Sequence, residues 1–499
     1  MDELTIQPPP VPKSPAEQRR WQHTRLRRRL LYGAWDRDLA GRLREQIGAV
    51  RAEAWGGGSS RDMSSNVFRV CATGLAALYS RWPTISHEDG AAGIVAAIEE
   101  AGLWPLMSRV QRDTLGLREM LIRVDVTTAG ALTFRPVFPD MVLATSDADN
   151  PGQPVTIKEA RQRLDPVSKK YGWAWDVIDI SNPEAPVYKI LGTDGSDQTR
   201  RYLGVDAMEG AAYPYRDNQD RPIQPYAIYH AAETATLWDP YEWRELLEGS
   251  LSASVYFNLV AHTMRCASWP QRWTIGCEVA GSGYSDEDGD GAGRSSIVTD
   301  PATVLMLRPS EDMAGQPTVG QWAPGADPQK LQETALAYEK RVATYAGVRA
   351  SDILRQSGDP KSGYALSITR AAQREGQAAF EPMFRRADLS LIRIAAAMLN
   401  RANGSDLPED GYRITYEGIP LSPEEMKAQR EQLEKMLTLG LMDKAEAYQE
   451  LHPGVSRGDA INRLAGIATF DTEMAALIAG DDPLTTTTAA GDSFTVTTE

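Results

Sequence analysis

Ser456 is the first side chain whose surroundings could support catalysis. It lies in Gly454-Val-Ser-Arg-Gly458, which matches the G-x-S-x-G pattern of hydrolases. In those enzymes a strained turn between a strand and a helix exposes the serine nucleophile. Here Leu451-His-Pro precedes the motif between two short predicted helices, and the sequence places no base beside it. We therefore expect Ser456 to cap the helix that follows, and we predict that the protein is not an enzyme.

A second candidate site is an acidic, glycine-rich segment. Its acidic residues copy the first half of a calcium loop, in which alternating carboxylates converge on the cation. A bidentate glutamate should occupy the twelfth position, but Ile297 stands there, and the flanking segments have the pattern of strands rather than helices. We expect an exposed acidic loop, and the sequence leaves open whether it binds a cation. The residues concerned are Asp286, Glu287, Asp288 and Asp290.

The remaining motifs give no cofactor site. Gly358-Asp-Pro-Lys-Ser362 has the lysine and serine of a phosphate-binding loop, but Pro360 replaces the glycine whose N–H group would face the phosphate. The three cysteines show no C-x-x-C spacing, and the five histidines are dispersed. We expect no metal and no cofactor.

Length and charge narrow the class of protein. A chain of 499 residues is expected to form two to four structural units. No run approaches the roughly 18 apolar residues of a membrane span, so we expect no membrane-spanning segment and do not count a membrane among the expected partners. The net charge of −15 argues against a tight grip on DNA, because that affinity comes mainly from lysine and arginine neutralising phosphates. An acidic protein surface can still allow DNA to slide past it, because negative side chains do not bind the negatively charged phosphates.

The N-terminal region is the exception to this acidity. Residues 13–51 carry eleven lysines and arginines against four acids. The segment 15–55 is predicted to be helical, because Ser14 and Pro15 are favoured at a helix cap and first position. We expect the basic side chains to pair with acidic surface in this chain or a neighbouring subunit, with DNA or membrane contact as the alternative.

The middle of the chain has the pattern of an α+β unit. Helical spacing at 63–82 and 91–114 is followed by β-rich runs at 120–126 and 131–137, which a turn at 128–130 joins into a predicted hairpin. We predict a mostly antiparallel sheet between about 115 and 235. Three further strand-like runs support it, at 171–179, 187–191 and 222–229.

Two helices flank a small predicted β unit. The first spans 242–267, and the β unit with the acidic loop follows between 272 and 324. The second begins where Asp327 caps it and Pro328 takes its first position, and Gly347 ends it. Its apolar residues alternate by four and three, which predicts a seam for a partner helix. We expect four of them to pack between subunits: Leu331, Tyr338, Val342 and Tyr345.

The last third of the chain is predicted to be helical. A polar, breaker-rich loop at 349–361 leads to the longest helix, which runs from Ser362 to about Ala402 and should kink at Pro382. Short helices are predicted at 423–437, 443–452 and 459–466. The threonine-rich tail at 481–499 is poor in large apolar groups, and we expect it to be disordered.

This order of elements resembles the portal proteins of tailed phages and gene-transfer particles. The resemblance covers about residues 60–465. It is carried by the element order and by two short stretches: Tyr338-Glu-Lys-Arg-Val-Ala-Thr-Tyr-Ala-Gly347 and Ser362-Gly-Tyr-Ala-Leu366, the second of which looks like the S-G-x-A-L start of the family's long helix.

The resemblance implies an α+β portal fold with named parts. These are an N-terminal basic helical arm (1–60), an α+β wing (61–242), stem helices (243–268 and 326–347), a clip (269–325), a tunnel loop (348–361), a long kinked wing helix (362–404), a helical crown (405–480) and the disordered tail. It also implies a ring of twelve copies at one capsid vertex, through which double-stranded DNA enters during packaging and leaves during ejection. The implied partners are the terminase packaging motor, a head–tail adaptor, and the major capsid and scaffold proteins. The protein would be found in the virion, and in the host cytoplasm during assembly.

Two site hypotheses and two alternatives follow. Arg349, Arg355 and Lys361 lie on or beside the implied tunnel loop, where they would touch phosphates transiently or pair with Asp352 and Asp359. The acidic loop would lie in the clip, where a motor or adaptor could dock. The alternatives are another capsid-associated oligomeric protein without a DNA tunnel, and a hydrolase that uses Ser456.

Overall fold

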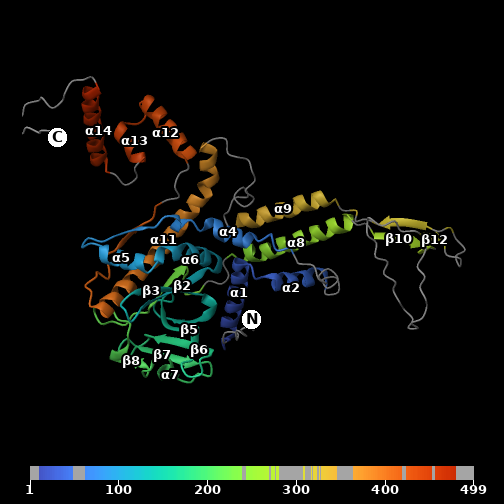
Figure 1. The fold of residues 1–499 in the computed structure, drawn as a ribbon, viewed down its shortest axis with the longest axis horizontal. Helices are drawn as coiled ribbons and strands as arrows, with labels where there is room; N and C mark the ends of the chain where they lie inside the picture. The colour runs from blue at the N-terminus through green and yellow to red at the C-terminus, as the bar shows by residue number, and fades with distance from the viewer. Residues whose placement is uncertain are drawn as a thin grey trace, which may run out of the picture. The chain divides into compact units, whose positions relative to one another are not determined.

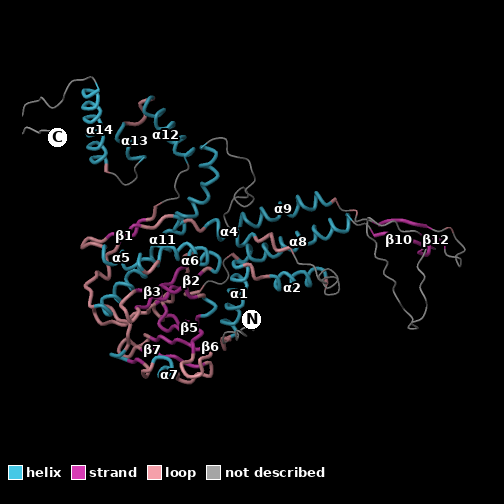
Figure 2. Tube along the Cα trace, viewed as in Figure 1, coloured by secondary structure: helices cyan, strands magenta, loops and turns pink. Residues whose placement is uncertain are grey.

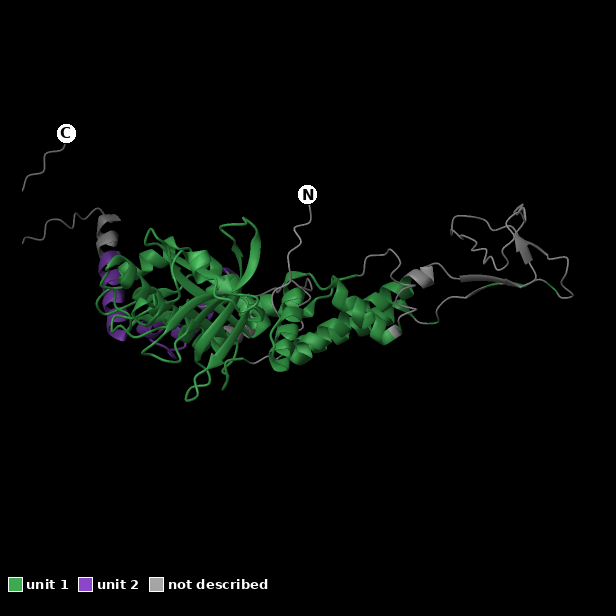
Figure 3. Ribbon diagram, turned by 90° about the horizontal axis from the view of Figure 1, so that it is seen from below, with its two compact units in different colours: residues 1–357, 370–419 green, residues 358–369, 420–499 purple. Residues whose placement is uncertain are grey.

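The computed structural model describes residues 11–48, 62–238, 243–268, 271–275, 277–279, 307–309, 316, 318–322, 325, 327–345, 363–417, 423–451 and 456–478. The chain is an α+β protein with two compact units (Figure 3). Unit 1 comprises Met1–Ser357 and Arg370–Ile419, and unit 2 comprises Gly358–Thr369 and Pro420–Glu499. The predicted fold class is confirmed.

Two antiparallel sheets form the β part of unit 1. The smaller has the strand order β3-β2-β9, and the larger has the order β4-β5-β6-β7-β8 (Figures 1 and 2). The bounds are β2 Glu119–Val126, β3 Leu132–Val137, β9 Tyr226–His230, β4 Val142–Ser146, β5 Pro154–Leu164, β6 Tyr171–Asp179, β7 Val187–Gly192 and β8 Met208–Glu209. The predicted β2–β3 hairpin is confirmed, with Val126 opposite Leu132. The sequence interpretation missed β4 and β5.

Helix α6 packs on β2 and β9 of the smaller sheet, α7 packs on β7 of the larger sheet, and helices on several sides of α6 build the main core. The helices are α1 Pro15–Tyr32, α2 Asp36–Ile47, α4 Val67–Leu75, α5 Ala92–Glu100, α6 Leu103–Leu117, α7 Thr199–Leu203, α8 Arg244–Ser268, α9 Pro328–Tyr345 and α11 Gly363–Asn403, with the 3-10 turns η1 Leu78–Ser80, η2 Pro139–Met141 and η3 Gly210–Ala212. The core includes Phe68, Met107, Leu121 and Leu391. A short sheet pairs β1 (Thr84–Ser86) with β14 (Arg413–Thr415) beside α11.

The N-terminal helix differs from its prediction in length and in packing. It ends at Tyr32 because Gly33 adopts a φ of +81°, which glycine accommodates without strain. Helix α2 then begins at Asp36. Within unit 1, α1 packs closely on α6, where a Cβ at Gly116 would lie 2.6 Å from Leu31 Cδ1. Over 15–47, the residues of the expected basic helical arm lie within unit 1.

Short antiparallel ribbons follow α8 and precede α9 in the chain. Strand β10 (Gln271–Ile275) pairs with β13 (Thr318–Trp322), and β11 (Cys277–Val279) pairs with β12 (Leu307–Pro309). The acidic loop 286–290 lies outside the described residues, as do Gly347 and the loop with Arg349, Arg355 and Lys361.

The described residues of unit 2 form the helices α12 Pro423–Thr438, α13 Lys444–Leu451 and α14 Arg457–Ile478, besides the first residues of α11. The first two match their predicted ranges closely. Helix α14 is much longer than the predicted 459–466, because Ala465 to Ile478 contains no proline and only one glycine, Gly466.

Candidate functional site

Helices α8 and α9 form an antiparallel pair at the centre of the candidate assembly site. Gly249 lies against Val342 and Tyr256 lies against Tyr338, so the two helices run in opposite directions. The predicted cap of α9 is confirmed: the Gln329 N–H donates to Asp327 Oδ1 at 3.0 Å.

The apolar residues of α9 serve mainly contacts within the chain. Val342 is buried against α8, and the ring of Tyr338 meets the ring of Tyr256 edge-on at 4.9 Å between centroids. Val342 therefore finds a partner in α8 of the same chain, and its expected packing between subunits stays a prediction. Leu331 is half-buried, whereas Tyr345 is 65% exposed, and a subunit contact stays a prediction for both.

Polar contacts fix the helix pair to the body of unit 1. The Ser65 hydroxyl donates to Glu339 Oε1 of α9 at 2.7 Å, and both groups are buried. On α8, the Ser254 hydroxyl donates to the Ser65 carbonyl, and the Ser250 hydroxyl accepts from the Phe68 N–H at 3.2 Å. The segment that leads into α4 therefore holds both helices of the pair.

Gly249 is the residue that lets the two helices approach. A Cβ at this position would lie 2.7 Å from Val342 Cγ2, well inside van der Waals contact. We expect Gly249→Val to destabilise unit 1 by about 1–3 kcal/mol, because a branched methyl pair must displace a stiff, buried valine. Urea unfolding measures the change.

Two further variants test whether the loss of stability in Gly249→Val comes from helix propensity or from steric overlap with Val342. Gly41→Ala in α2, where a Cβ meets nothing within 4 Å, should be neutral or stabilising by up to about 1 kcal/mol. Adding Val342→Ala to Gly249→Val should recover part of the loss through the vacated volume. Equal effects of the substitutions at Gly249 and Gly41 would contradict the close approach.

Arg20, Arg25 and Arg28 of α1 make polar contacts within unit 1. Arg20 Nη1 donates to the Pro139 carbonyl at 2.9 Å, and its Nη2 donates to the Val142 carbonyl at 2.6 Å. Arg28 Nη1 lies 3.0 Å from the buried Asp140 carboxylate, and Arg25 Nε lies 3.4 Å from it. These contacts favour the pairing interpretation over DNA contact for these arginines.

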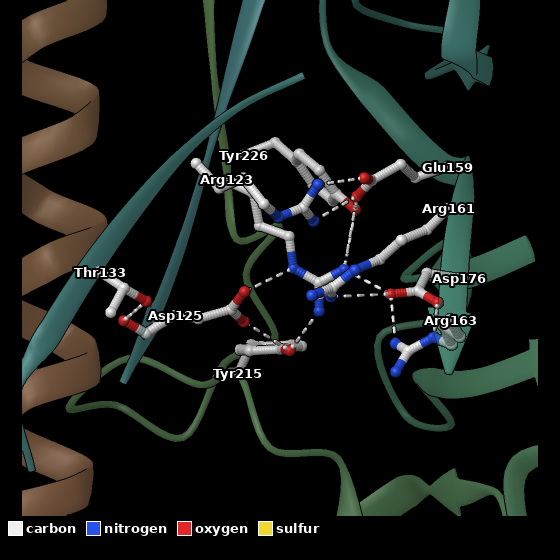
Figure 4. Close-up of polar contacts among 10 residues, drawn as sticks. Arg123, Asp125, Thr133, Glu159, Arg161, Arg163, Asp176, Tyr215 and Tyr226 are labelled. Atoms are coloured by element: carbon white, nitrogen blue, oxygen red, sulfur yellow. Dashed lines mark hydrogen bonds and ion pairs between the residues drawn. The ribbon is translucent and has the colours of Figure 1, made fainter. Parts of the chain in front are cut away.

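A buried charge cluster joins the two sheets of unit 1. Arg123 is buried in β2, and its Nη1 donates to Asp176 Oδ2 of β6 at 2.9 Å. Asp125 Oδ2 lies 2.9 Å from Nε, and Glu159 Oε2 of β5 lies 3.5 Å from Nη1. Figure 4 shows these carboxylates converging on the guanidinium group. The hydroxyls of two tyrosines complete the contacts: Tyr215 and Tyr226.

Three further arginines surround the acids of this cluster: Arg135, Arg161 and Arg163. Arg135 forms a two-point contact with Glu159, and Arg163 donates to both oxygens of Asp176 at 2.9 and 2.6 Å. Burial by itself raises the pKa of Asp176, but attraction to Arg123 and hydrogen bonds from Arg163 outweigh it and hold the pKa below its ordinary value. The cluster can hold the sheets together, with Asp176 kept in its charged form.

A second buried cluster anchors α11. The hydroxyls of Tyr79 and Tyr229 donate to Asp388 Oδ2 and Oδ1, each at 2.7 Å, and the Tyr416 hydroxyl also donates to Oδ2. Burial raises the pKa of Asp388 to about 6, although these hydrogen bonds act in the opposite direction. The carboxylate connects α11 with η1, β9 and the residue just after β14.

Ser456 caps α14 as expected. The Asp459 N–H donates to the Ser456 hydroxyl oxygen at 3.2 Å, and that hydroxyl donates to Asp459 Oδ2 at 2.8 Å. The described part of the chain contains no group of three side chains suited to a metal ion. Within that same part, no helix is both long and apolar enough to span a membrane.

Comparisons with known proteins give a loose structural likeness. No protein-family model and no curated protein matches this chain. One similar solved structure is the neck of a native gene transfer agent particle computed with C12 symmetry, at 11% identity and a TM-score of 0.39, covering 79% of this chain and 91% of the other. Another is the virion of a native gene transfer agent particle, at 12% identity and a TM-score of 0.39, covering 78% and 90%.

Proposed function

We propose that this chain is a capsid-associated structural protein and, more specifically, a portal subunit that forms a ring around a channel for double-stranded DNA. The observation that carries the proposal is the antiparallel α8–α9 pair, with β ribbons between its helices and the long helix α11 after it in the chain. This is the element order that the portal resemblance implies. The same order would assign the packaging motor and head–tail adaptor to the ribbon end of the pair.

Charge supports a channel better than a clamp. The chain carries −15, while Arg20, Arg25 and Arg28 of its basic N-terminal helix are engaged inside unit 1. A ring of such chains repels phosphates in general, which lets DNA move. The alternative is a capsid-associated oligomer without a tunnel. The burial of Val342 favours this alternative, because the α8–α9 pair covers its own apolar residues and then needs fewer contacts with neighbouring subunits.

The first test is the mass of the full-length protein in solution. Sedimentation should show one large species made of many copies of the 54.8 kDa chain, with twelve as the expected number. A protein that stays monomeric at every concentration and salt condition would overturn the proposal.

The channel part of the proposal has its own test. Replacing Arg349, Arg355 and Lys361 together by alanine should lower the DNA content of assembled particles, because transient phosphate contacts are removed, while ring mass stays unchanged. Arg200→Ala, at a highly exposed position of α7, serves as the control. Normal DNA content in the triple variant would refute the role of this loop.

A further inference from the structure

Unit 2 has an apolar surface that its own helices leave uncovered. Ala460, Leu464 and Ile467 share one side of α14, because they are spaced by four and three residues. Ala460 is fully buried and Leu464 is half-buried, but Ile467 is 50% exposed. The burial of this row of apolar side chains therefore decreases from the start of α14 toward its end.

Helix lengths explain the loss of cover. Helix α13 packs on α14, but its 8 residues span about 12 Å, whereas the 22 residues of α14 span about 33 Å. Ile461 and Phe470 lie on either side of the row formed by Ala460, Leu464 and Ile467, and they are 51% and 60% exposed. At 100° per residue they widen the apolar surface to about half of the helix. We call Ile461, Ile467 and Phe470 the α14 stripe.

The same unit carries a second exposed apolar element. Leu439 and Leu441 flank Gly440 in the turn between α12 and α13, and they are 71% and 70% exposed. Gly440 has a φ of +65°, which fixes a tight turn that presents both leucines. Their exposure means that this leucine turn does not cover the α14 stripe within unit 2.

We propose that the leucine turn of one copy docks on the α14 stripe of a second copy. This inference rests on the proposed function and names one contact of the ring. A projecting turn and an open stripe on separate elements of one unit are the two halves of a head-to-tail contact. Each copy then gives one turn and receives another, and such contacts close into a ring. A self-complementary contact of one patch with itself would leave one of the two elements exposed.

The full-length chain with paired substitutions tests this contact. Leu439→Glu with Leu441→Glu removes the turn, and Ile467→Glu with Phe470→Glu removes the stripe. Each variant should need at least roughly tenfold more protein for half-assembly, because exposed apolar anchors are replaced by charges. An equal mixture of the two should form head-to-tail dimers, since one intact contact remains between the unlike copies.

A matched control adds the same charges elsewhere on these helices. Gln432→Glu with Asn462→Glu changes exposed polar positions of α12 and α14, and it should assemble like the wild type. Circular dichroism should show equal helix content in all variants, because every substituted side chain is exposed.

The outcomes separate this inference from the proposed function. If the wild type forms rings and both variants assemble at unchanged concentrations, the docking contact is refuted while the ring stands. If the wild type is monomeric throughout, both are refuted. If amide exchange in α14 is equally slow in dilute monomer and in the assembly, the stripe is covered by its own chain, which also overturns the contact.

Discussion

Replacing Arg123 by methionine is expected to destabilise unit 1 by about 3–5 kcal/mol, because it leaves buried carboxylates without their central cation. Asp176 and Glu159 are both buried; after the change each keeps its outer arginine, and Glu159 also keeps the hydrogen bond from the Tyr226 hydroxyl. Methionine fills much of the volume of the arginine side chain, so the loss of unfolding free energy measures the removed charge more than the removed packing. Urea unfolding followed by tryptophan fluorescence is a suitable measurement, since Trp173 and Trp175 lie on β6 beside Asp176.

Arg161 provides the matched control for this prediction. It belongs to the same cluster, but it lies 3.8 Å from Asp176 and its side chain is 38% exposed. Arg161→Met should therefore change the free energy of unfolding by less than about 1 kcal/mol. Arg123→Lys should fall between the two, because an ammonium group cannot reproduce the multiple contacts of the guanidinium. Similar losses for Arg123→Met and Arg161→Met would show that the central position has no special role.

The stability of unit 1 is expected to depend on pH through Asp388. Its pKa is about 6 in the folded protein, against about 3.9 in an unfolded chain. Between these values the folded state binds the proton more tightly, so stability is highest below about pH 4 and falls as pH rises to 6. The difference corresponds to about 3 kcal/mol.

Asp388→Asn removes this titration and isolates its effect. The free energy of unfolding of the wild type, relative to the variant, should decrease by about 2 kcal/mol between pH 4 and pH 7, because the unfolded chain is already half ionised at pH 4. Other carboxylates contribute equally to both proteins and cancel. Asn150→Ala, at an exposed position, should give a constant difference over the same range, because it changes no titrating group. A constant difference for Asp388→Asn as well would contradict the raised pKa.

Local sequence patterns predicted the helices and turns that are determined by residues close to one another in the chain. The β2–β3 hairpin has branched residues on both sides of a glycine turn, and α9 begins at an Asp-Pro pair that satisfies its first N–H groups. The α+β class followed from such elements. The length of α14 was missed because Gly466 suggested an end, although the residues after it favour helix.

The buried clusters could not be predicted from spacing. The partners of Arg123 come from β5 and β6, and only the strand pairing brings them together. One signal was available: an arginine inside Met120-Leu-Ile-Arg-Val124 stands within an apolar strand, where a charge requires partners. Asp388 on the buried side of α11 gave a similar signal.

The seam on α9 illustrates a different limit. Its period predicted an apolar partner helix, and α8 supplies that partner for Val342 and Tyr338. Periodicity identifies the side of a helix that packs, but it does not tell whether the partner belongs to the same chain. Subunit contacts therefore have to be sought where exposure persists, at Tyr345 and on α14.

Electron micrographs of the purified full-length protein test the central claim most directly. A portal subunit should appear as rings with an axial hole in end views, and class averages should reveal their rotational symmetry. Substitution of the leucine turn should reduce the number of these rings, while the control variant should keep it. Compact particles without a hole, at protein concentrations where the chain is fully assembled, would contradict the proposed channel.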